Sequence, residues 1–137
     1  MRNIHNIHVV PAINPASVAD NTAAASAIID TFGFNELEFI ITIGSVADAD
    51  ATFAVTMEHG DDSSLSDTAA VTSANLIGTL AEAGFQYNSD NSVRRVGYRK
   101  SKRYVRMTIT PTNNASAAVF GAVAVLADAT LSPTTNP

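Results

Sequence analysis

Apolar and polar residues alternate along several short segments of this chain, which is the pattern of β-strands that bury one face. Each of these segments is bounded by residues that favour turns. The segments that predict strands are 24–30, 37–43, 53–57, 93–98, 103–110 and 117–130. Helical spacing of apolar residues occurs only over 68–83, where Gly78 interrupts it, so we expect at most one short helical turn there. The pattern therefore predicts an all-β protein, an antiparallel β-sandwich that is jelly-roll-like.

The last predicted strand, 117–130, differs from the others because both of its faces are apolar. Val119 and Val123 lie on one face, and Phe120 lies on the other. Such a strand is either central in a sandwich or pressed against a partner. Gly121 within it indicates a bulge or the close approach of another backbone segment.

The two ends of the chain carry prolines that argue against regular secondary structure. Pro11 and Pro15 lie in the N-terminal segment, and the C-terminal segment 131–137 contains two more. We expect residues 1–15 to form an extended arm and residues 131–137 to form a tail, both lying on neighbouring subunits. Because no second core is visible in 137 residues, the whole chain, 1–137, is predicted to be a single β-sandwich domain with these extensions.

Positive charge is concentrated in one stretch of the chain. The formal net charge is −5, yet seven of the eight Lys and Arg residues fall within 94–106. This stretch joins the segments 93–98 and 103–110 through a polar turn, so the sequence predicts a basic β-hairpin. We expect the hairpin to form a protein interface with Tyr98 and Tyr104 as amphipathic anchors, because Arg is favoured at interfaces and pairs with carboxylates. The predicted interface residues are Arg94, Arg95, Tyr98, Arg99, Lys100, Lys102, Arg103, Tyr104 and Arg106.

Other interpretations of the basic hairpin stay open from the sequence. Nucleic acid is a natural ligand for clustered cations with nearby tyrosines, but a net charge of −5 and a pI near 4.9 oppose the binding of a polyanion. A solvated basic turn without a partner is another interpretation. If the hairpin contacts protein, the acidic residues of a second copy are a suitable partner, which predicts a head-to-tail homo-oligomer.

The low charge content also bears on partners. Charged residues make up 15% of the chain, below the roughly 25% of typical globular domains. Such a surface fits a protein partly covered by other subunits, and it fits equally a β-protein with threonine-rich faces. The chain has no Cys, so it has neither disulfides nor thiolate sites. No segment approaches the ~20 apolar residues of a membrane span and no signal peptide is recognisable, so we expect a soluble protein without a membrane partner.

Residues that could carry chemistry do not form a recognisable catalytic pattern. There is no Gly-rich phosphate loop, no nucleophile elbow, and no motif that pairs a His with a Ser or an acid. His5 and His8 lie three residues apart on an extended segment and point to opposite faces, so no metal site is predicted there. Asp61, Asp62 and Asp67 could ligate calcium, but their spacing does not match an EF-hand, and a solvated loop is the better interpretation. We therefore expect neither catalysis nor a cofactor.

Several stretches of the sequence resemble small structural proteins of tailed bacteriophages. The resemblance covers most of the chain from Ile28 onward. It departs from the pattern of those proteins at Arg99, Lys100 and Ser101, where a Gly-rich turn often stands. The stretches are IIDTFGFNELEFIITIG (28–44), FAVTMEHGDD (53–62), VGYRKSKRYVRMTITPT (96–112), the apolar final strand, and LSPTTNP (131–137).

This resemblance implies a structural protein of the virion head that is made in the host cytoplasm. It would bind the major capsid protein or other head proteins as a decoration or cement protein that bridges capsomers. A head-to-tail connector or a tail-associated ring protein is the alternative within the same class. From another class, a host-surface or carbohydrate-binding module also suits the predicted fold, although the absence of Trp and the low Tyr content disfavour stacking on sugars.

Overall fold

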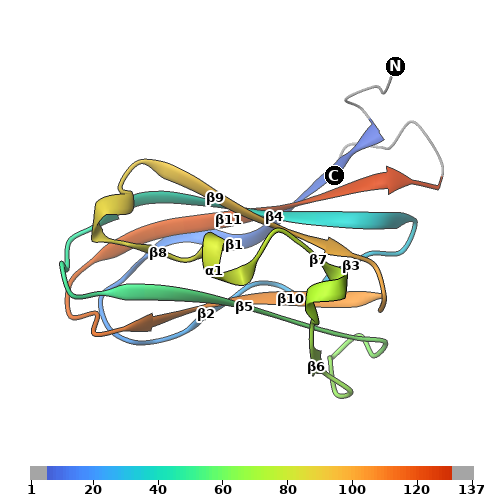
Figure 1. Ribbon diagram of the computed structural model, residues 1–137, viewed down its shortest axis with the longest axis horizontal. Helices are drawn as coiled ribbons and strands as arrows, with labels where there is room; N and C mark the ends of the chain where they lie inside the picture. The colour runs from blue at the N-terminus through green and yellow to red at the C-terminus, as the bar shows by residue number, and fades with distance from the viewer. Residues whose placement is uncertain (1–5, 131–137) are drawn as a thin grey trace.

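The computed structural model describes residues 6–130, which form two antiparallel sheets packed face to face (Figure 1). The predicted antiparallel β-sandwich is thus confirmed. The five-stranded sheet has the spatial order β1 (His8–Val18), β11 (Ala118–Ala129), β4 (Phe34–Val46), β9 (Ser92–Arg99) and β7 (Leu76–Ile77). The six-stranded sheet has the order β2 (Ala24–Ala25), β10 (Tyr104–Thr112), β5 (Thr52–Gly60) and β6 (Ala69–Ala70), with β3 (Ile29–Asp30) paired to β10 and β8 (Phe85–Gln86) paired to β5.

Helical structure within residues 6–130 is short. The four-residue helix α1 (Leu80–Ala83) lies between the 3-10 turns η2 (Ser73–Asn75) and η3 (Tyr87–Ser89). The Thr79 hydroxyl caps α1 by accepting a hydrogen bond from the backbone N–H of Glu82 at 3.1 Å. The prediction of at most one short helix is confirmed. No helix in the described part of the chain is long and apolar enough to cross a membrane.

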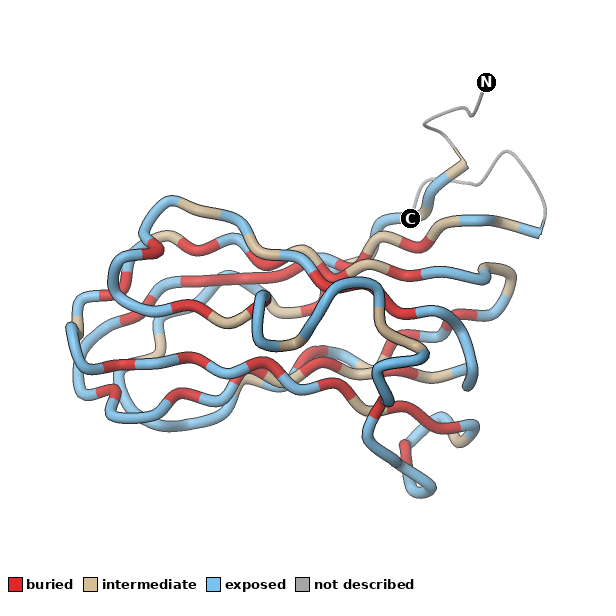
Figure 2. Tube along the Cα trace, in the orientation of Figure 1, coloured by how far each residue is buried: buried red, intermediate tan, exposed pale blue. Residues whose placement is uncertain are grey.

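The alternating apolar residues of the long strands fill the space between the two sheets (Figure 2). On β4, Phe39 and Ile41 are 0% exposed, and from the opposite sheet Val105, Met107 and Ile109 are 0% exposed. Burying a side chain of this size contributes about 1.5–3 kcal/mol. The period-two pattern therefore identifies the inner faces correctly.

An aromatic cluster holds the helical segment against the sandwich. Phe53 and Phe85 stack with their ring centroids 4.7 Å apart, and Phe120 meets both rings edge-on at 5.7 and 5.4 Å. Since Phe85 follows directly after α1, and α1 contacts both β5 and β9, the segment 80–89 covers the opening between the two sheets.

The strand predicted over 24–30 forms as two short pieces, β2 and β3, which both pair with β10. Ser26 lies between them. Its backbone N–H donates to the carbonyl of Met107 at 2.7 Å, and its hydroxyl accepts from the N–H of Met107 at 3.0 Å. Because the hydroxyl takes the place of a backbone carbonyl, regular pairing stops at this residue.

The predicted basic hairpin is wrong. The strand β9 pairs with β4 and β7 in the five-stranded sheet, whereas β10 pairs with β5, β2 and β3 in the other sheet. Residues 100–103 therefore carry the chain from one sheet to the other, and we call them the arch. Alternation does not distinguish the two arrangements, because strands of a hairpin and strands of opposite sheets both bury every second residue.

The prediction of an N-terminal arm over 1–15 is also wrong for the described part of that segment. The strand β1 pairs with β11 along the edge of the five-stranded sheet. Pro11 and Pro15 are tolerated because one side of an edge strand needs no partner for its N–H groups. Shifts of register on both sides of Ile13 accommodate them. Residues 1–5 and the predicted tail, 131–137, lie outside the described residues.

The final strand, β11, lies between β1 and β4 in the five-stranded sheet. Gly121 permits the predicted close approach, because a Cβ atom there would lie 3.1 Å from the backbone of Pro15. The bulge lies elsewhere, between Val119 and Phe120.

Candidate functional site

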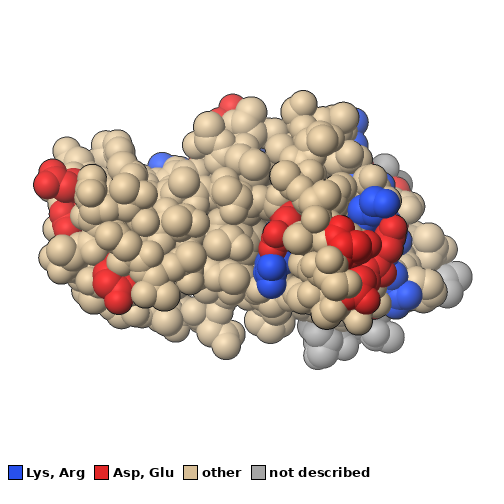
Figure 3. Space-filling model, turned by 90° about the horizontal axis from the view of Figure 1, so that it is seen from below, with Lys and Arg blue, Asp and Glu red and all other residues tan. Residues whose placement is uncertain are grey.

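The predicted interface residues divide between the two ends of the sandwich. Arg94 and Arg95 lie near the beginning of β9, and the remainder surround the arch at the other end. Seen from the side of the six-stranded sheet, charged side chains of both signs gather at one end of the molecule, while much of the remaining surface is uncharged (Figure 3). The residues around the arch are Tyr98, Arg99, Lys100, Lys102, Arg103, Tyr104 and Arg106.

Two cations of the arch pair with carboxylates of their own chain. The Arg103 guanidinium donates to both carboxylate oxygens of Asp30, at 2.8 and 2.9 Å. The hydrogen bonds from Arg103 lower the pKa of Asp30. The Lys102 ammonium lies 3.1 Å from Asp61 Oδ2. The charges of these cations are thus matched within one chain, and the predicted contact with the acids of a second copy stays a prediction.

Two more ion pairs bridge neighbouring strands. Arg106 on β10 donates to Glu58 on β5 through Nε at 2.7 Å, and this contact lowers the pKa of Glu58. Arg95 lies 3.7 Å from Glu38, and the Arg95 side chain is 77% exposed. An ion pair as exposed as Arg95–Glu38 contributes roughly 0–1 kcal/mol, so it sets local charge more than stability.

Tyr98 does not serve as an exposed anchor, because its side chain is 0% exposed. Its hydroxyl reaches under the arch and accepts hydrogen bonds from the N–H groups of Ser101 at 3.1 Å and Lys102 at 2.8 Å. The hydroxyl proton has two possible acceptors, the Lys102 carbonyl at 3.1 Å and Nδ1 of His59 at 2.8 Å. Tyr98 is therefore a structural residue that holds the crossing between the sheets.

Tyr104 and Arg103 belong to an ordered stack on the surface. The Arg103 guanidinium carbon lies 4.8 Å from the ring centroid of Phe32 and 5.1 Å from that of Tyr104. Phe32 is 71% exposed, and its backbone N–H donates to Asp30 Oδ1 at 3.0 Å. Next to the stack, the Lys100 ammonium donates to the carbonyl of Thr31 at 3.3 Å. Arg99 is exposed, and no carboxylate of residues 6–130 pairs with its side chain.

The acidic loop after β5 uses its carboxylates on its own backbone. Asp67 accepts from the N–H groups of Asp61 at 2.9 Å and Asp62 at 3.2 Å. Hydrogen bonds from Ser64 and Ser66 lower the pKa of Asp62 to about 2. Among residues 6–130, no three His, Asp or Glu side chains gather in the manner of a metal site.

The outer side of the five-stranded sheet carries an exposed apolar surface, which we call the valine face. Its most exposed side chains are 37–58% accessible. Beside them lies a groove of about 340 Å³ between β1 and β11, with Gly121 and Thr42 among its lining residues. Contiguous exposed apolar surface is a common feature of protein interaction sites. The valine face consists of Val9, Ile40, Val93, Val119, Val123 and Val125.

The sheet edges offer little to a partner strand. In the five-stranded sheet, one edge is β1 with its two prolines and the other is the two-residue strand β7. In the six-stranded sheet, the outer strands are the two-residue strands β2, β3, β6 and β8. Short edge strands and edge prolines disfavour the addition of strands from another chain. Residues 92–96 of β9 and 54–56 of β5 have no strand partner on their outer side.

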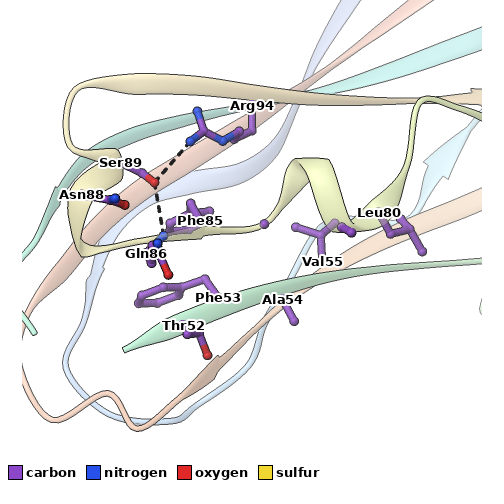
Figure 4. A pocket seen from close by; sticks show the side chains of 12 residues that line it. Thr52, Phe53, Ala54, Val55, Leu80, Phe85, Gln86, Asn88, Ser89 and Arg94 are labelled. Carbon is purple, nitrogen blue, oxygen red and sulfur yellow. Dashed lines mark hydrogen bonds between the residues drawn. The ribbon is translucent and has the colours of Figure 1, made fainter. Parts of the chain in front are cut away.

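A cleft of about 580 Å³ opens beside β5 and the segment 80–89 (Figure 4). Arg94 reaches into it from β9, between η3 and α1. Thr52, Gln86 and Asn88 supply further polar groups, and Leu80 supplies an apolar wall.

The sequence analysis found part of this arrangement. The valine face follows from the strand 117–130, whose two apolar faces predict either a central strand or a partner. The cleft was missed, because its lining residues come from five different elements and meet only in the folded chain. The partners of the cations, Asp30, Glu58 and Asp61, were missed for the same reason: they lie 41–73 residues from the cations that they pair with.

Comparison with known proteins shows the fold. No protein-family profile and no curated protein sequence matches the chain. The exported protein XepA of PBSX is similar in structure, with a TM-score of 0.60 at 11% identity, over 100% of this chain and 42% of XepA. The family 22 carbohydrate-binding module of Clostridium thermocellum Xyn10B gives a TM-score of 0.46 at 10% identity, over 94% of this chain and 91% of the module. A chain of Broad Bean Stain Virus gives 0.41 at 9% identity, over 74% of this chain and 63% of that one.

Proposed function

We propose that this protein is a structural component of a tailed-phage particle and that it catalyses no reaction. It attaches to the protein subunits of the head through the valine face and so decorates and stabilises the shell. A protein at the head-to-tail junction would attach through the same face. The proposal is therefore first about the surface that attaches and only then about the place in the particle.

The observation that carries the proposal is the apolar surface on the outer side of the five-stranded sheet. Val119 and Val123 are 39% and 38% exposed, and both line the groove of about 340 Å³. Interface centres are depleted in charge, and the two charged residues on this surface, Arg95 opposite Ile40 and Glu38 opposite Val125, pair with each other at 3.7 Å.

Three further points support the proposal. The edge strands are short or carry prolines, which favours contact with other subunits through a face. The sequence stretches that resemble phage structural proteins include β4 and the β9–β10 segment, whose inner residues belong to the core. The similar fold of XepA, from the phage PBSX, is compatible with this role.

A sedimentation experiment tests the proposal. The purified protein is mixed with phage particles from cells that carry its gene and separated on a density gradient. We expect the wild-type protein to move with the particles. Val123→Arg, which places a charge at the centre of the valine face, should weaken this association at least about tenfold, because a buried unpaired charge is strongly unfavourable.

Thr110→Arg is the matched control, since Thr110 is exposed on the outer side of the other sheet. Association equal to wild type is expected for this variant. A wild-type protein that stays at the top of the gradient, or a Val123→Arg variant that binds as well as Thr110→Arg, would overturn the proposal.

A further inference from the structure

Phe32 has the most exposed large apolar side chain of residues 6–130, at the tip of the turn between β3 and β4. The N–H of Phe34 closes this turn by donating to the carbonyl of Thr31 at 3.0 Å, and Gly33 takes the left-handed conformation with φ 89°. The Arg103 guanidinium lies over the Phe32 ring at 4.8 Å. A side chain presented on such a turn loses little conformational freedom on binding, so Phe32 is suited to fill a pocket of another chain.

The groove between β1 and β11 is a pocket of suitable size and chemistry. On the outer side of β11, Gly121 carries no side chain between Val119 and Val123, which leaves a hollow in the valine face. Among the residues that line the groove, Asn14 and Thr42 are the two with polar side chains. A cavity of about 150 Å³ accepts benzene. The groove of about 340 Å³ therefore has room for a phenyl ring.

Phe32 cannot reach the groove of its own chain. Phe34 lies opposite Ala129 near the end of β11, and Val123 stands six residues earlier on that strand. At about 3.3 Å per residue, the turn and the groove are about 20 Å apart along β11. Figure 1 shows the same separation, because β11 begins at the left end of the molecule and β3 and β4 meet at the right end. A Phe32 ring that fills the groove must come from a second copy.

The charges beside the turn and beside the groove are complementary. The Lys100 ammonium donates to the carbonyl of Thr31, next to Phe32, and forms no ion pair in the described part of the chain. Four carboxylates lie in loops at the other end of the molecule, where Ala118 begins β11. None of the four forms an ion pair within residues 6–130. These acids are Asp20, Asp48, Asp50 and Asp90.

We infer that two copies of this protein associate by placing Phe32 of one copy in the groove of the other. The contact is heterologous, because two different surfaces meet. It removes an exposed aromatic ring from water and brings the Lys100 ammonium toward the acids near the groove. The inference does not rest on the proposed attachment to the head, because it requires only two copies of this chain.

Sedimentation equilibrium of the purified protein tests the inference. We expect the weight-average mass of the wild-type protein to rise with concentration, with a dissociation constant at or below about 1 mM. Phe32→Ala removes the ring and should weaken self-association at least about tenfold. Tyr87→Ala is the matched control, because Tyr87 is another exposed aromatic residue, at 50%, and lies outside both the turn and the groove. It should associate as wild type does.

Thr42→Arg tests the other side of the contact. Thr42 is an exposed residue that lines the groove, so the variant places a charge where the ring would bind and should weaken self-association at least about tenfold. Thr110→Arg introduces the same side chain on the outer side of the other sheet and should associate as wild type does. Thermal unfolding of each variant checks that it is folded.

An equimolar mixture of Phe32→Ala and Thr42→Arg tests that the two surfaces meet each other. The first variant keeps the groove, and the second keeps the Phe32 ring. The mixture should therefore form dimers that contain one copy of each, at a concentration at which each variant alone is monomeric. Mixing cannot restore a contact between like surfaces, such as two valine faces.

Four results would overturn the inference. They are a wild-type protein that stays monomeric at about 1 mM, self-association of Phe32→Ala equal to that of Tyr87→Ala, self-association of Thr42→Arg equal to that of Thr110→Arg, or a mixture of the two weakened variants that stays monomeric. Phe32→Ala keeps the valine face and should still move with phage particles on the density gradient. Failure of the head-attachment proposal and failure of this inference are therefore separable.

Discussion

The hydroxyl of Tyr98 gives a direct test of the arch. Tyr98→Phe removes this one oxygen from a side chain that is 0% exposed and leaves the ring in the core. The hydroxyl accepts from the N–H groups of Ser101 and Lys102, and it donates to either the Lys102 carbonyl or His59 Nδ1. Three hydrogen bonds are therefore lost at any moment.

The magnitude follows from the burial of the partners. Each hydrogen bond contributes about 1 kcal/mol net, and an unsatisfied buried group costs more than an exposed one. Ser101 and Lys102 are exposed, so water replaces part of the loss there, whereas His59 is only 7% exposed. We expect Tyr98→Phe to lower the free energy of unfolding by about 2–3 kcal/mol, and Tm by about 7–10 °C in a chain of this length.

Urea unfolding followed by far-UV circular dichroism measures this loss, because the chain has no Trp for fluorescence. Tyr104→Phe is the matched control. Its hydroxyl makes no hydrogen bond to any described residue, so a change within about 0.5 kcal/mol is expected. A Tyr98→Phe variant as stable as Tyr104→Phe would refute the role of the hydroxyl in holding the arch.

Two further predictions concern His59 on β5 and Gly97 on β9. Burial is the main cause that lowers the pKa of His59 in the folded protein, and the charge of Lys102 is the next. Near and below the ordinary histidine pKa of about 6.5, the unfolded chain therefore binds more protons than the folded protein. The free energy of unfolding should fall as pH decreases through that value. Guanidinium unfolding between pH 8 and 5 checks this, and an equal pH dependence in His59→Gln would contradict it. Gly97→Ala should destabilise by about 1–3 kcal/mol, because the new Cβ would lie 2.8 Å from Cβ of Ile77. A double-mutant cycle with Ile77→Gly should show a coupling of at least about 1 kcal/mol, and additive effects would contradict the contact.

The candidate site could be predicted only in part from the sequence. The clustering of cations within 94–106 indicated one basic surface, and the structure does bring Lys102, Arg103 and Arg106 to one end. It also pairs each of them with an acid, places Tyr98 inside the core, and turns Arg94 into a cleft at the other end. The sequence does not reveal such neighbours, because the pairs are brought together by the pairing of β10 with β3 and β5 in the six-stranded sheet.

The alternation of residues alone determined that 37–43, 53–57, 93–98 and 103–110 are strands and which side of each is buried, but it did not reveal β1. This succeeds because the direction of a side chain on a strand is a local property with a period of two residues. Only the tertiary structure decided which strands pair, and therefore that 100–103 form an arch between sheets instead of a hairpin turn. Pairing depends on long-range packing. The buried face of β10 would suit a hairpin with β9 as well as a place in the opposite sheet. The core that both sheets share, together with the hydrogen bonds from the arch to the Tyr98 hydroxyl, selects the second arrangement.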